Sequence, residues 1–148
     1  PSQFSRHLVV DGQWSAEHFA KVRDIVWNRD YKIQCRPDKL AKLSDFVVAK
    51  RRFLLSLLEN PNLLEHDAFT ELLWAVFHVA DELANRKSVY GLPESDYEHL
   101  GGDVKRAYRL LLREWIDYME HLKSNYPYLF SLEIRTNPFD PEASVEVK

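Results

Sequence analysis

The sequence predicts an all-α protein, a bundle of about four principal helices with short extended segments at both ends. Apolar residues recur every three or four positions over long stretches, and the prolines and glycines fall mainly in short breaks between those stretches. Only four glycines leave little room for an all-β design. The 148 residues, 45% of them hydrophobic, predict a single domain, 1–148, with an entry arm 1–14, a helical bundle 15–125 and an extended tail 126–148.

The segment 67–85 predicts the central helix. Its apolar side chains occupy most of the circumference of the helix, and they are Phe69, Leu72, Leu73, Trp74, Ala75, Val76, Phe77, Val79, Ala80, Leu83 and Ala84. A helix that is apolar on nearly all sides is unstable in water. We therefore expect the other helices to surround it.

Two helices are predicted before the central one. Ser15 is a favourable N-cap for a helix that runs to about Asn28. Asp38 is expected to cap a second helix over 39–59, and its inward stripe includes Phe46 and Phe53.

The last helix is predicted from about Ser95 to Asn125. The segment Ser95-Asp-Tyr-Glu98 has the capping-box pattern. The pair Gly101-Gly102 is a weak point, where a short turn and a restart at Asp103 would fit. Beyond Pro127 a short strand is expected, because three apolar residues alternate with polar ones, namely Phe130, Leu132 and Ile134.

Motifs for catalysis are absent from the sequence. There is no Gly-x-Ser-x-Gly nucleophile elbow and no glycine-rich phosphate loop. The single cysteine, Cys35, permits no internal disulfide and no cysteine-rich metal site, which fits a reducing, intracellular compartment. We therefore expect no enzymatic activity and no cofactor.

Two pairs of residues are the candidates for a metal site, although our prediction is that the protein holds no metal. His78 and Glu82 are four residues apart, as are Asp117 and His121, so each pair lies on one helix face. If the two helices faced each other, these side chains would converge on one ion. The Glu-x-x-His pattern of di-iron bundles is missing, and the nearest match, Asp96-x-x-His99, lies at a helix start.

Charge is distributed unevenly. Residues 1–65 contain eleven Lys and Arg against eight Asp and Glu, whereas residues 66–148 contain nine against fifteen. Pairing between the two halves is the simplest explanation. The only basic triplet, 50–52, points in three directions on a helix, and the pI is about 6.1, so we expect no nucleic-acid partner.

Two segments carry a resemblance to a known family, KRRFLLSLLENPNLLEHDAFTELLWAVFHVADELA at 50–84 and NYPYLFSLEIRTNPFDPEAS at 125–144. Together they resemble the soluble C-terminal region that follows the pore segment in prokaryotic two-transmembrane, potassium-channel-like proteins. The Thr-x-Gly-Tyr-Gly selectivity filter of such channels is not in this sequence.

The resemblance implies a non-enzymatic cytosolic domain that assembles or regulates an ion-channel-like membrane protein. Its partners would be other subunits of the same protein, as a homo-oligomer, and the adjacent membrane segment. The basic early half is compatible with the cytosolic flank of a membrane helix. Two alternatives remain: a free-standing cytosolic interaction module, and a metal-binding helical enzyme that uses the two candidate pairs.

Overall fold

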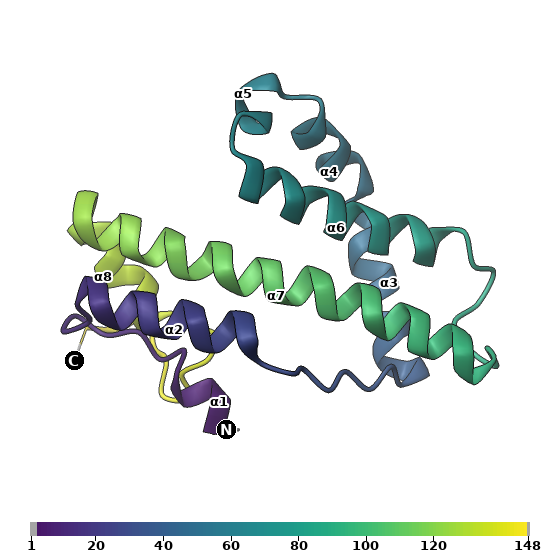
Figure 1. Ribbon diagram of the computed structural model, residues 1–148, viewed down its shortest axis with the longest axis horizontal. Helices are drawn as coiled ribbons and strands as arrows, with labels where there is room; N and C mark the ends of the chain where they lie inside the picture. The colour runs from purple at the N-terminus through teal and green to yellow at the C-terminus, as the bar shows by residue number, and fades with distance from the viewer. Residues whose placement is uncertain (1–2, 148) are drawn as a thin grey trace. The chain divides into compact units, whose positions relative to one another are not determined.

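A computed structural model of the chain describes residues 3–147 and shows eight helices and no strand in that range (Figure 1). The predicted all-α class is therefore confirmed. The chain divides into two compact units, one formed by 1–29 with 112–148 and the other by 30–111. No helix of the described residues has the length and apolar character needed to cross a membrane.

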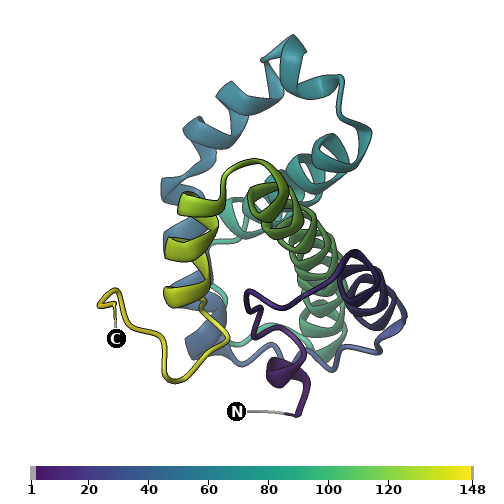
Figure 2. The same cartoon turned by 90° about the vertical axis from the view of Figure 1, so that its left-hand side faces the viewer.

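The first unit contains α1 (Gln3–Arg6), α2 (Ala16–Asn28), α8 (Pro127–Arg135) and the part of α7 (Glu94–Asn125) that follows Leu111. In Figures 1 and 2, α2 runs beside this part of α7. Ser15 caps α2 as predicted, because its hydroxyl accepts a hydrogen bond from the backbone N–H of His18 at 3.2 Å. The buried core includes Leu8, Trp14, Phe19, Val22, Val26, Leu112, Ile116, Met119, Leu122 and Phe130.

Polar contacts join distant segments within the first unit. Arg23 on α2 pairs with Asp117 and Glu120 on α7. The amide of Asn137 is fully buried; it donates to the carbonyl of Leu8 at 2.8 Å and accepts from the backbone N–H of Phe139 at 2.9 Å. The entry arm and the tail are thus linked through one satisfied buried side chain.

The second unit contains α3 (Pro37–Ala49), α4 (Arg51–Leu58), α5 (Pro61–Leu64), α6 (Asp67–Ala84) and the first part of α7. Helices α3, α4 and α5 all contact α6, and both views show α4 alongside it (Figures 1 and 2). Their shared core also includes the start of α7, and its buried members are Leu40, Val47, Leu54, Val79, Ala80, Leu83, Val89 and Leu100.

The predicted second helix is wrong in two respects. It is two helices, α3 and α4, which meet at Lys50, and Asp38 lies inside α3 because Pro37 already occupies its first turn. Phe46 and Phe53 are also exposed, at 64% and 59% of their surface. In α3 the inward position is Val47, and its neighbour Phe46 is rotated by about 100° around the helix axis.

Helix α6 matches the predicted central helix, but the other helices do not surround it completely. Leu72, Leu73 and Val79 are buried, whereas Trp74 is 57% exposed and Phe77 is half-buried. An indole ring tolerates such a position because surface apolar residues are common in folded proteins.

Two further predictions about helix ends need correction. Helix α7 begins at Glu94, so Ser95 lies within its first turn and does not cap it, and the helix continues through Gly101-Gly102. The predicted strand at 130–134 and the first part of the extended tail are replaced by α8. Pro127 at its first position suits a helix start, and three alternating apolar residues are too few to specify a strand.

Candidate functional site

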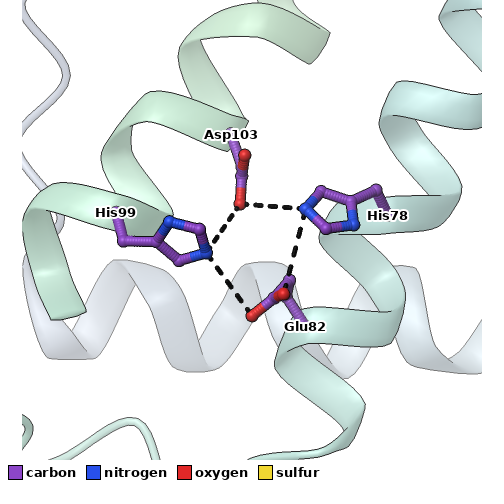
Figure 3. A group of neighbouring side chains, drawn as sticks. All are labelled: His78, Glu82, His99 and Asp103. Carbon is purple, nitrogen blue, oxygen red and sulfur yellow. Dashed lines mark ion pairs between the residues drawn. The ribbon is translucent and has the colours of Figure 1, made fainter.

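The side chains of four residues converge in the second unit, and Figure 3 shows them pointing toward one another. His78 and Glu82 come from α6, and His99 and Asp103 come from α7. Each pair is spaced four residues apart, so both members project from the same helix face. Packing of Val79 and Leu83 in one core with Leu100 brings the two helices together.

The nitrogen–oxygen distances in this cluster range from 3.3 to 3.8 Å. The Nε2 atoms of His78 and His99 both lie 3.3 Å from Oδ2 of Asp103. Glu82 approaches from the other side, with Oε1 at 3.8 Å from His78 Nε2 and Oε2 at 3.7 Å from His99 Nε2. One ligand-type atom from each residue fits in a group whose members all lie within 4.8 Å of one another.

Asp103 differs from its neighbours in burial. Its side chain is 7% exposed, whereas those of His78 and His99 are 46% and 52% exposed. The Oδ2 atom of Asp103 is buried and accepts no hydrogen bond from any residue between 3 and 147. Burial of a carboxylate oxygen without a hydrogen bond is unfavourable, so this atom marks the cluster as unusual.

Arg86 holds Glu82 in place. Its Nη1 donates at 2.6 Å both to Oε2 and to the backbone carbonyl of Glu82, and its Nε and Nη2 donate to the two carboxylate oxygens of Asp96. The hydrogen bond from Arg86 lowers the pKa of Glu82 below its usual value, and partial burial opposes this effect. Glu82 is therefore fixed at the cluster in its ionised form.

The four sequence candidates lie in different units. His78 and Glu82 belong to the cluster, whereas Asp117 and His121 belong to the first unit. There Asp117 pairs with Arg23, and His121 contacts Asn125 of its own helix.

His99 and Asp103 were not predicted to be the partners of His78 and Glu82. The signal that would have found them is the same four-residue spacing that identified His78 and Glu82. Asp96, the carboxylate of the segment that comes nearest to a di-iron motif, pairs with Arg86.

Cys35 shows no sign of an activated nucleophile. The side chain is half-buried, and burial raises the pKa of its thiol. Reactive cysteines have a lowered pKa, because the thiolate is the nucleophile.

An apolar groove is the second notable feature of this unit. It lies between α3, α4 and α6, encloses about 330 Å³, and is lined by Phe46, Val47, Lys50, Phe53, Leu54 and Val76. Lys50 is the only charged residue in the lining. The exposed rings of Phe46 and Phe53 border a groove that offers apolar contacts and almost no polar ones.

Fold and site together define an all-α helical domain with a histidine–carboxylate cluster between two helices. The family model described as "Uncharacterized protein MJ1433, C-terminal helical domain" matches residues 1–135, and the chain belongs to this family. The relative named "Uncharacterized protein MJ1433" from Methanocaldococcus jannaschii is 44% identical over 139 residues, which are 94% of this chain and 56% of that protein. The chain thus spans about half the length of this relative. No solved structure matches it.

Proposed function

We propose that this chain is a non-enzymatic assembly or regulatory domain of a longer protein, and that it acts through protein–protein contacts. The observation that carries this proposal is the apolar groove with the exposed rings of Phe46 and Phe53. Exposed aromatic residues around an apolar groove are typical of a surface that a protein segment covers.

The occupant we propose is an apolar segment from the part of the longer protein that lies outside this chain. The M. jannaschii relative supports this choice, because this chain accounts for 56% of its length and the matching family is described as a C-terminal domain. The single charge in the lining, Lys50, favours a largely apolar segment that carries a carboxylate. We expect no nucleic acid at this surface.

Hydrogen exchange measured on the full-length protein and on the 148-residue chain tests the proposal. Backbone amides of 46–54 are expected to exchange more slowly in the full-length protein, while those of α2 serve as an internal reference. Replacing Phe46 and Phe53 together by Ser should remove this protection. Tyr128→Ser on α8, at another exposed aromatic ring, is the matched control and should leave it unchanged.

Equal exchange of 46–54 in the two proteins would contradict the proposal. Protection that rises with the concentration of the isolated chain would assign the groove to a second copy of the domain.

A finer hypothesis is that the longer protein is an ion-channel-like membrane protein with this domain on its cytosolic side. It is supported by the resemblance of segments 50–84 and 125–144. The test is the reading frame upstream of Pro1, which should encode two apolar segments of about 20 residues around a pore loop. A frame without such segments would overturn the channel hypothesis and leave the interaction hypothesis standing.

A further inference from the structure

We propose that His78, Glu82, His99 and Asp103 form a binding site for one divalent transition-metal ion, with Zn²⁺ as the ion that suits it best. Nothing in this proposal depends on the groove or on the protein-contact function. It follows from three features of the cluster: the spacing of its ligand atoms, the state of Asp103, and the support that Arg86 gives to Glu82.

The spacing of the ligand atoms is close to the spacing around a tetrahedral ion. Zinc bonds of about 2.0–2.2 Å to nitrogen and oxygen place neighbouring ligand atoms about 3.3–3.6 Å apart in a tetrahedron. Oδ2 of Asp103 lies 3.3 Å from each imidazole nitrogen, and the two oxygens of Glu82 lie at 3.8 Å (Oε1 to His78) and 3.7 Å (Oε2 to His99). Direct hydrogen bonds between the same groups would bring them to about 2.7–3.2 Å. The side chains are therefore arranged around a common point at ion-pair distance, and Oδ2 of Asp103 accepts no hydrogen bond from either imidazole.

Asp103 supplies an independent reason to place a cation there. Its Oδ2 atom is buried, without a hydrogen bond, and faces the two imidazole nitrogens. The guanidinium of Arg106 is near Oδ1 instead, at 3.8 Å. A metal ion between the imidazoles would satisfy Oδ2 directly and offset the cost of burying it.

The ligand set determines which ion fits. Two imidazoles and two carboxylates suit first-row transition ions, whereas Mg²⁺ and Ca²⁺ prefer oxygen ligands alone. Four protein ligands fill a tetrahedral shell, which is typical of structural zinc sites and leaves no position for substrate. The half-exposed His78 and His99 provide a path for entry from solvent. The ion would thus join α6 to α7 without catalysing a reaction.

Arg86 is not one of the four ligands but supports one of them. It fixes Glu82 by a hydrogen bond to Oε2 and is itself fixed by Asp96 on α7. Carboxylate ligands in metal sites are commonly held by such outer hydrogen bonds, and loss of one typically costs about 10–100-fold in metal affinity. We therefore assign Arg86 as a positioning residue for Glu82.

Calorimetric titration of the untagged, EDTA-treated 148-residue chain with ZnCl₂ tests the proposal. The expected result is one Zn²⁺ per chain, with at least tenfold weaker binding in His78→Ala and in His99→Ala. His121→Ala removes an exposed histidine of α7 outside the cluster and should bind Zn²⁺ like the unmodified chain. Circular dichroism establishes that each variant is folded, and Glu82→Gln provides a near-isosteric variant with the same expected loss.

A second readout is the thermal melting temperature with and without Zn²⁺. Zn²⁺ should raise it in the unmodified chain and in His121→Ala and raise it less in the cluster variants, because an ion that binds only the folded state stabilises that state in proportion to its affinity. Absence of Zn²⁺ binding by the unmodified chain would overturn the proposal. Binding of equal affinity in His78→Ala and His99→Ala would overturn it as well, since the ion would then be bound elsewhere.

Discussion

Arg86 and Asp96 form a two-point ion pair across the loop that joins α6 to α7. Nη2 lies 2.6 Å from Oδ1 and Nε lies 3.0 Å from Oδ2, so the planar guanidinium meets both carboxylate oxygens. The Arg86 side chain is largely buried, and it also binds Glu82 at the end of α6. The pair therefore connects the end of one helix to the first turn of the next.

This pair predicts a stability contribution that depends on pH. The hydrogen bond and charge of Arg86 lower the pKa of Asp96 below its ordinary value of 3.8. A carboxyl with a lowered folded-state pKa stabilises the fold above its ordinary pKa, and the contribution is lost as pH falls through the folded-state value. Asp96→Asn should thus be less stable than the unmodified chain at pH 7, and the difference should shrink below about pH 4.

Urea unfolding at pH 7 and at pH 3 measures this difference. Asp45→Asn, at an exposed aspartate of α3, is the control and should show a smaller effect at pH 7. An Asp96→Asn deficit that stays constant with pH would show that the carboxylate charge is not its cause.

Replacing two glycines by alanine should change the stability of the chain in opposite directions. At Gly102, inside α7, a Cβ atom would have no other atom within 4 Å, so Gly102→Ala should stabilise the chain by about 0.5–1 kcal/mol through helix propensity. Gly91 has a φ of 73°, where an L-residue is strained, so Gly91→Ala should destabilise by about 1–2 kcal/mol. Thermal unfolding of both variants checks the pair, and a loss of stability in Gly102→Ala would contradict the prediction.

Much of the helical content was predictable, because apolar periodicity over long segments determines α2, α6 and α7. The break at Lys50 was not, since no glycine or proline marks it and a continuous apolar stripe crosses it. Helix α8 was missed because its nine residues are too short for the helical period to outweigh a chance alternation. Such local ambiguities are resolved by tertiary packing, which the sequence pattern does not contain.

Half of the cluster was predictable from spacing within one helix. His78 and Glu82 lie on the same face of α6 because of the helix period alone, independently of the tertiary fold. The identification of His99 and Asp103 as their partners required knowledge of which face of α7 meets α6. Helix α7 has two His–Asp pairs with a spacing of four residues, His99 with Asp103 and Asp117 with His121. Only the packing of the core around Leu83 and Leu100 shows which pair lies next to α6.

Leu73 and Trp74 are neighbours on α6 with opposite environments. Replacing each by alanine should therefore lower the free energy of unfolding by very different amounts. Leu73 is 4% exposed, so Leu73→Ala should cost about 2–5 kcal/mol by removing buried surface and leaving a cavity. Trp74→Ala at the exposed position should cost about 1 kcal/mol or less. Urea unfolding of both variants measures the two values. Equal costs would contradict the orientation of α6.

Replacing Asp103 by asparagine should change the stability in a way that distinguishes a metal site from a network of ion pairs. In EDTA, Asp103→Asn should melt at a higher temperature than the unmodified chain, because it removes a buried carboxylate that accepts no hydrogen bond at Oδ2. With Zn²⁺ the order should reverse, since only the carboxylate provides a strong ligand to the ion. Asp45→Asn, at an exposed aspartate, should follow the unmodified chain in both conditions. A lower melting temperature for Asp103→Asn in EDTA would mean that the imidazoles of His78 and His99 already stabilise the carboxylate as ion pairs, without an ion.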